Sequence, residues 1–241
     1  MITLTRVMPA ASVMILALVA LARCTAERAD EPRMLPADRS RSVLYVALGD
    51  STVEGVAASS RERNYVSLIY ERLRARYPAA RLENLGRGGA VSNDVLTAQL
   101  PRAIDLRPDL VTLSVGPNDI TTGVAAEAYD RNVDEILRRL TRDTRAVIVV
   151  NLLPDLTVTP RFRFSERRAA LDELTRRFNQ VVATRAHERG VDIVDLYERS
   201  RAEVPGQPEL VAADGYHPSD LGYARWAELM WERIAPRIEP R

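Results

Sequence analysis

Val43-Leu-Tyr-Val-Ala-Leu-Gly-Asp-Ser-Thr52 (VLYVALGDST) is an apolar run that ends in a glycine, a carboxylate and a hydroxyl. A short run of this kind is typical of a strand buried on both faces of a parallel sheet. The residues Gly49-Asp50-Ser51 then either make an ordinary turn or hold a serine at the rim of a site. The rest of the chain has to decide between these two interpretations.

Short apolar runs alternate with longer helical patterns along the rest of the chain. Besides the strand at 43–48, strands are expected at 81–85, 109–115, 145–151 and 191–196. Helices are expected at 64–77, 92–106, 125–142, 165–189 and 219–235. Strand–helix alternation with right-handed crossovers gives a parallel sheet covered on both faces. The sequence therefore predicts an α/β fold, a flavodoxin-like three-layer α/β/α sandwich with a five-stranded parallel sheet.

The composition is that of a globular protein. Of 241 residues, 46% are hydrophobic and 28% are charged, and the formal net charge is +1. Every basic residue is arginine, interleaved with Glu and Asp without a basic stripe, so nucleic acid is not expected as a partner. One Cys excludes an intrachain disulfide, and with two His it makes a zinc cluster improbable. No phosphate-binding glycine loop is present, and we expect neither a cofactor nor a metal.

The N-terminal segment has the pattern of an export leader. Arg6 is followed by an apolar run at 7–22, shorter than the roughly 20 residues that a membrane span needs. Ala20-Leu21-Ala22 fits the small-x-small cleavage pattern of a secretory signal. Residues 1–24 are therefore expected to be a signal peptide or an uncleaved N-terminal anchor, and the protein to be exported, either secreted or held in the periplasm or at the cell surface.

The leader also bears on the domain division and on membrane contact. Cys24 stands where a lipoprotein cysteine would, but Arg23 precedes it, which disfavours lipid anchoring. Residues 25–42 are polar and contain proline, which predicts a linker before one domain at 43–241. Any membrane association is expected through the N-terminal segment only, and the domain is expected to be a monomer.

Polar residues follow other predicted strands as well. Asn84–Gly89 follows the second strand, Gly116–Asp119 follows the third, and Asp214–Pro218 directly precedes the last helix. In doubly wound sheets, ligands bind outside the carboxyl ends of the strands. Four polar segments at one predicted edge favour a functional site over four unrelated turns.

Ser51, Asp214 and His217 have the chemistry of a nucleophile, an orienting carboxylate and a base. A serine hydroxyl is a weak nucleophile unless a base takes its proton, and histidine suits that role near neutral pH. Asp214 precedes His217 by three residues, so in a turn it can reach one ring nitrogen while the other faces Ser51. Taken singly, these residue types are more often a helix cap, a turn aspartate or a loop histidine than catalytic groups.

Acyl transfer also needs donors for the oxyanion. Candidates are the backbone N–H of Ser51, a glycine N–H such as that of Gly89, and the side-chain amide of Asn118. The alternative interpretation is a flexible glycine turn and a turn begun by Pro117. Asp50 and Asp119 are expected to brace the loops.

These segments together carry a family resemblance. Gly49-Asp50-Ser51, Gly89, Gly116-Pro-Asn-Asp119 and Asp214-Gly-Tyr-His-Pro218 resemble the four conserved blocks of the SGNH (GDSL) hydrolase superfamily, in order, over most of 43–235. The resemblance implies a metal-free serine esterase with Ser51 as nucleophile, His217 as base and Asp214 as its partner. It implies an oxyanion hole made by Ser51, Gly89 and Asn118. Gly88 competes with Gly89, and the family's Asn-x-x-x-x-Gly pattern favours Gly89.

The substrate is less well defined by the sequence. A small-molecule or lipid-like ester is expected, as for a carboxylesterase, lipase or lysophospholipase. Segment 152–164 is either a loop packed on the core or a wall for an acyl chain. A carbohydrate acetylesterase or an acyltransferase using the same site is the alternative, and a non-catalytic binding domain is the third hypothesis.

Overall fold

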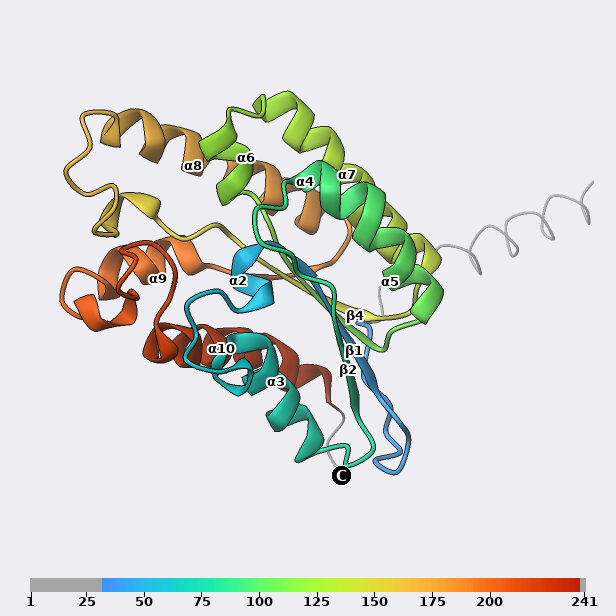
Figure 1. Cartoon of the computed structure of the whole chain (residues 1–241). Helices are drawn as coiled ribbons and strands as arrows, with labels where there is room; N and C mark the ends of the chain where they lie inside the picture. Colours follow the sequence, from blue (N-terminus) through green and yellow to red (C-terminus); the bar gives the residue numbers. More distant parts are fainter. Residues whose placement is uncertain (1–31, 239–241) are drawn as a thin grey trace, which may run out of the picture. The chain divides into compact units, whose positions relative to one another are not determined.

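The computed structural model describes residues 32–238, and residues 33–238 belong to one compact unit. Its centre is a five-stranded parallel sheet in the order β2-β1-β3-β4-β5, which confirms the predicted fold (Figure 1). The strands are β1 (Leu44–Gly49), β2 (Arg81–Asn84), β3 (Leu110–Ser114), β4 (Val147–Asn151) and β5 (Asp192–Val194).

Helices cover both faces of the sheet (Figure 1). In chain order they are α2 (Ser51–Glu54), α3 (Tyr65–Arg74), α4 (Ser92–Asp94), α5 (Leu100–Leu106), α6 (Pro117–Thr122), α7 (Ala126–Asp143), α8 (Arg168–His187), α9 (Leu196–Glu203) and α10 (Asp220–Ile234). Figure 1 shows α3 and α10 below the sheet and α5, α7 and α8 above it. Short 3₁₀ turns occur at Leu156–Val158 (η3) and Pro208–Leu210 (η4).

The side chains of each central strand pack into two hydrophobic cores, one on each face of the sheet. In β1, Leu44, Val46 and Leu48 pack in the core on the α7 face, while Tyr45 and Ala47 pack in the core on the α3 and α10 face. Because successive side chains of a strand point to opposite faces, a strand buried on both is largely apolar. This is the physical reason why β1, β3 and β4 are recognisable as nearly continuous apolar runs, although β3 also buries Thr112 and Ser114.

The predicted helix at 92–106 contains a break in its helical geometry. The chain winds as α4, then as a π-helical turn at Val95–Gln99 (η2), then as α5. A π-turn admits one extra residue and redirects the side chains that follow it. Here it accompanies Gln99, whose buried side chain contacts the end of β1.

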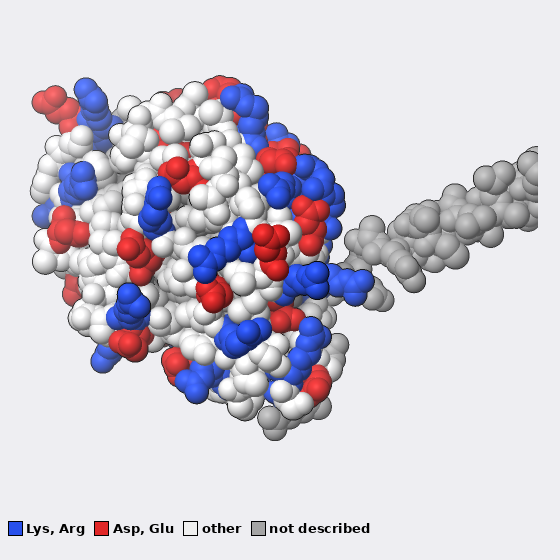
Figure 2. Space-filling model, turned by 45° about the vertical axis from the view of Figure 1, so that its right-hand side comes forward, with Lys and Arg blue, Asp and Glu red and all other residues white. Residues whose placement is uncertain are grey.

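The predicted leader at 1–24 and part of the predicted linker at 25–42 lie outside the described residues, so export and lipidation at Cys24 stay predictions. Within 32–42, Leu35 is buried and its N–H donates to the carbonyl of Arg237. None of the helices in residues 32–238 is both long and apolar enough to cross a membrane. On the face shown in Figure 2, acidic and basic side chains are interleaved.

Candidate active site

The end of β1 is fixed by a glycine and a buried glutamine. Gly49 has φ +148°, and a Cβ there would lie 1.9 Å from the carbonyl oxygen of Ser114, so only glycine fits. The side chain of Gln99 accepts from the N–H of Gly49 and donates to its carbonyl, both at 2.8 Å. The amide therefore pairs with Gly49 beyond the end of β2, beside the N–H of Arg87, which donates to the same carbonyl at 3.2 Å, and holds the backbone that leads into Ser51.

Ser51 is the first residue of the short helix α2. Asp50 caps this helix, because its carboxylate accepts from the N–H of Thr52 at 3.0 Å and from the Thr52 hydroxyl at 2.9 Å. The Asp50 side chain is turned inward and is 1% exposed, while Ser51 stays half-buried. The cap thus directs the carboxylate into the protein and leaves the next hydroxyl at the rim of the sheet.

The structure brings Ser51, His217 and Asp214 into one hydrogen-bonded line. The Oγ of Ser51 lies 2.9 Å from Nε2 of His217, and Nδ1 of the same ring lies 2.6 Å from Oδ2 of Asp214. With the Nδ1–H donating to the carboxylate, Nε2 presents its lone pair to the hydroxyl. An imidazole held in this way can take the serine proton.

The turn that carries His217 also holds its carboxylate. The Oδ1 of Asp214 accepts from the N–H groups of Tyr216 at 2.9 Å and His217 at 3.0 Å, which leaves Oδ2 for the ring. Burial alone would raise the pKa of Asp214, but the His217 ring and these two N–H groups outweigh it and hold the pKa below its ordinary value. The carboxylate is therefore ionised when it faces the imidazole at neutral pH.

The end of β2 and the loop after it are tied to α2 by two hydrogen bonds, and a third holds the loop itself. The Nδ2 of Asn84 donates to the carbonyl of Val53 at 2.7 Å, and its Oδ1 accepts from Gly86 at 2.9 Å. The N–H of Gly88 donates to Oε2 of Glu54 at 2.5 Å. That bond occupies the N–H of Gly88 and favours the neighbouring Gly89 as an oxyanion donor.

The N–H groups of Gly89 and Ser51 are free to bind a ligand atom. Within residues 32–238 neither N–H has a hydrogen-bond partner. Gly89 has φ +77° and open space where a Cβ would stand, so glycine is favoured there by its backbone conformation rather than by crowding.

Asn118 and Asp119 connect the loop after β3 to the glycine loop. The Nδ2 of Asn118 donates to the carbonyl of Ala90 at 3.0 Å, which leaves its second amide hydrogen available. Buried Asp119 accepts from the N–H of Ser92 at 2.9 Å and from its hydroxyl at 2.5 Å. The two loops that carry Gly89 and Asn118 are thus bound to each other.

Burial of Asp50 predicts a measurable pH dependence of stability. Desolvation raises the pKa of Asp50 from 3.8 to about 6. Because the folded state then binds the proton more tightly than the unfolded state, stability falls as the pH rises from about 4 to 6, by about 3 kcal/mol. We expect the unfolding free energy of Asp50→Asn, relative to the wild type, to increase by about this amount between pH 4 and pH 8 in urea titrations.

The control is Asp195→Asn. Asp195 caps α9 by accepting from Glu198 at 3.0 Å, as Asp50 caps α2, but it is exposed. Both substitutions remove the charge of a helix cap, but only Asp50→Asn removes a buried charge. The comparison therefore isolates the effect of burial on the pH dependence of stability. A difference between Asp50→Asn and the wild type that stays constant with pH would contradict the assignment.

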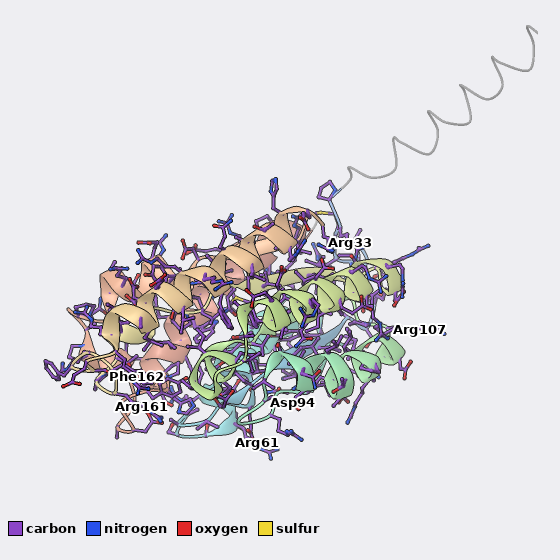
Figure 3. All side chains as sticks on the ribbon, turned by 90° about the horizontal axis from the view of Figure 1, so that it is seen from above. Arg33, Arg61, Asp94, Arg107, Arg161 and Phe162 are labelled. Carbon is purple, nitrogen blue, oxygen red and sulfur yellow. The ribbon has the colours of Figure 1, made fainter. Side chains whose placement is uncertain are left out.

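A cavity of about 110 Å³ lies beside the serine, and Ser51 and Pro117 are among its lining residues. Its walls come from the segment after β4, from α9, from η4 and from α10, and most of them are apolar: Leu156, Val158, Leu196, Val204, Leu210 and Leu229. Of the proposed wall at 152–164, five residues line this cavity: Pro154, Asp155, Leu156, Val158 and Thr159. Phe162 instead packs edge-on against Tyr216, and Figure 3 shows it beside Arg161 at the end of the domain opposite Arg33 and Arg107.

Three residues that shape the site were not assigned this role from the sequence. Gln99 holds β1 and Glu54 holds the glycine loop, while Asn84 was noted only as part of a motif. For Gln99, the sequence did offer an indication, because it is a polar residue in the apolar stripe of 92–106. Glu54 gave none, because its partner lies 34 residues away.

The comparisons with known proteins agree with this geometry. The GDSL-like Lipase/Acylhydrolase family matches residues 47–225. TesA shares the fold with 22% identity and a TM-score of 0.65, over 80% of this chain and 99% of its own. Axe2, an acetylxylan esterase from Geobacillus stearothermophilus, shares it with 20% identity and a TM-score of 0.66, over 85% and 100%.

A member of the lipolytic G-D-S-L family from Veillonella parvula has the same fold, with 19% identity and a TM-score of 0.63, over 79% of this chain and 97% of its own. No curated protein matches the chain. The match to the family spans most of the domain and includes all four segments around Ser51, which confirms the resemblance found in the sequence. The chain therefore belongs to the GDSL-like lipase/acylhydrolase family and is a carboxylic ester hydrolase.

Proposed function

We propose that this ester hydrolase acts through a Ser51–His217–Asp214 triad and an acyl-enzyme intermediate. The observation that carries the proposal is the continuous line of contacts, 2.9 Å from Ser51 Oγ to His217 Nε2 and 2.6 Å from His217 Nδ1 to Asp214 Oδ2. This geometry activates the hydroxyl and needs no metal.

The reaction takes two displacements. The Oγ of Ser51 attacks the ester carbonyl carbon while its proton passes to Nε2 of His217. The tetrahedral intermediate then breaks its bond to the alcohol oxygen, which takes the proton from the imidazolium. Water, deprotonated by His217, attacks the acyl-enzyme, and its collapse releases the acid and returns the proton to Ser51.

The negative oxygen of each tetrahedral intermediate needs donors already in place. We assign this role to the N–H groups of Ser51 and Gly89 and to the amide of Asn118. The support is that both N–H groups lack partners within residues 32–238, and that Asn118 is held by one amide hydrogen with the other free. Each such donor typically contributes about 10²–10³ to kcat.

The apolar cavity favours an ester with an aliphatic acyl chain. If the substrate were a carbohydrate acetyl ester, the cavity would have no role, because an acetyl group is too small to fill it. Sugar recognition commonly uses an exposed aromatic face, but Trp226 is buried and stacked on Tyr65 with ring centroids 5.0 Å apart. Trp231 packs against the core on the α10 face.

Covalent labelling tests the proposed nucleophile directly. A nitrophenyl alkylphosphonate reacts with an activated serine to form a stable ester that mimics the tetrahedral intermediate. We expect one equivalent to abolish hydrolysis of nitrophenyl butyrate by the full chain, with the label on the peptide that contains Ser51. Inactivation with the label elsewhere, or hydrolysis that survives full labelling of Ser51, would contradict the triad.

A further inference from the structure

The cavity beside Ser51 is bounded along its length by one face of each of two helices. From α10 it is lined by Gly222, Arg225, Trp226 and Leu229, and from α9 by Leu196, Arg199, Ser200 and Glu203. Spacings of three and four residues place each set on one helix face. Gly222 and Leu229 are seven positions apart, which corresponds to about 10 Å along the axis of α10. Figure 1 shows α9 and α10 near α2, which carries Ser51.

An ion pair separates the cavity from a neighbouring depression. Glu203, Leu210 and Arg225 line this cavity and also a second depression on the outside of η4 and α10, so these three side chains form the partition between them. Arg225 donates from Nε and Nη2 to the carboxylate of Glu203 at 2.8–3.3 Å. Its Nη1 donates outward to Glu228 at 3.1 Å.

The partition is a charged pair, whereas the walls are mostly apolar, although Asp155 and Arg199 also line them. Leu196, Leu229 and their neighbours favour methylene groups, and each methylene that enters such a wall improves binding about fourfold. An acyl chain that reaches Glu203 and Arg225 must displace a bidentate ion pair. Breaking this pair leaves each charge without its partner. Lengthening the chain therefore helps up to the pair and not beyond it.

We propose that this cavity holds the acyl chain of a medium-chain ester, and that the Arg225–Glu203 pair is the end stop that sets the longest chain accepted. The proposal rests on the proposed function, because it takes Ser51 as the atom to which the acyl group is bound. The acyl group stays on Ser51 after the first step, whereas the alcohol has to leave. His217, whose side chain is 15% exposed, protonates that alcohol, so the alcohol departs toward solvent at the Asp214–His217 turn and the acyl chain occupies the apolar cavity.

A chain-length series in matched variants tests the end stop. The full chain is assayed on nitrophenyl esters from butyrate to hexadecanoate, each below its solubility limit, and kcat/KM is compared with that for hexanoate. The test variant is Glu203→Ala with Arg225→Ala, which removes both charges together and orphans neither. The control is Glu228→Gln, which weakens only the outward bond of Arg225.

For the wild type we expect kcat/KM to rise with chain length, reach a maximum and then fall. In the double variant the maximum should move by at least two carbons, so that the ester two carbons past the wild-type maximum gains about fifteenfold relative to hexanoate. Glu228→Gln should keep the wild-type profile. An unchanged profile in the double variant, or an equal shift in Glu228→Gln, overturns the end stop. A wild type whose Ser51-dependent activity is insensitive to chain length overturns the acyl cavity and leaves the triad standing, whereas hydrolysis of no ester overturns the proposed function itself.

Discussion

Ser51→Ala should lower kcat for nitrophenyl butyrate by roughly 10⁶-fold, the scale that loss of a serine nucleophile has in serine hydrolases. Without Oγ no acyl-enzyme can form, and His217 can only activate water at a distance from the carbonyl carbon. The oxyanion donors remain, so a residual rate above the uncatalysed reaction is expected. Stopped assays over hours, with the phosphonate-labelled wild type as background, measure a decrease of this size.

The fold should survive this substitution. Ser51 is half-buried, and the cap of α2 comes from Asp50 rather than from the serine itself. The control is Ser42→Ala, which removes an exposed hydroxyl that donates to the carbonyl of Ala79. Full activity in Ser42→Ala with an unchanged melting temperature in both variants assigns the loss to chemistry. A Ser51→Ala variant that keeps more than a tenth of the activity would mean that another group is the nucleophile.

The fold could be predicted because its signals are local. The runs at 43–48, 109–115 and 145–151 are largely apolar because each becomes a strand buried on both faces, and the structure places β1, β3 and β4 within one residue or two of them. The run at 191–196 becomes a shorter strand, β5, because Asp195 already caps α9. Helix α9 itself was missed, since only Leu196 and Tyr197 on it are buried and the rest is largely charged.

The residues that meet in the candidate active site could also be predicted, whereas the residues that hold their loops in place could not. Ser51 and His217 lie 166 positions apart, yet each stands in a recognisable segment at the carboxyl edge of the sheet. Gln99 and Glu54 act through contacts with Gly49 and Gly88, which no periodicity encodes. The cavity depends on two helix faces meeting, and therefore needed the structure.

Asp214→Asn should lower kcat by about 10⁴-fold with little change in KM, as loss of the charged partner of a catalytic histidine does in serine proteases. The asparagine oxygen is still required by the N–H groups of Tyr216 and His217. Its amide nitrogen then faces Nδ1, which can only accept from it, so the ring proton moves to Nε2. The hydroxyl of Ser51 meets an N–H instead of a lone pair, and the proton transfer that starts the reaction is blocked.

Asp214→Asn should also change how the unfolding free energy depends on pH. Because hydrogen bonds hold the pKa of Asp214 below its ordinary value, its charge stabilises the fold above the unfolded-state pKa, and this contribution is lost as the pH falls through the folded-state pKa. The difference in unfolding free energy between wild type and Asp214→Asn should therefore shrink on acidification. Asp220→Asn is the control for kcat, since Asp220 is bound to Ser59 outside the triad. Equal activity losses in the two variants would show that Asp214 acts through the fold, whereas a loss confined to Asp214→Asn ties it to the tautomer of His217.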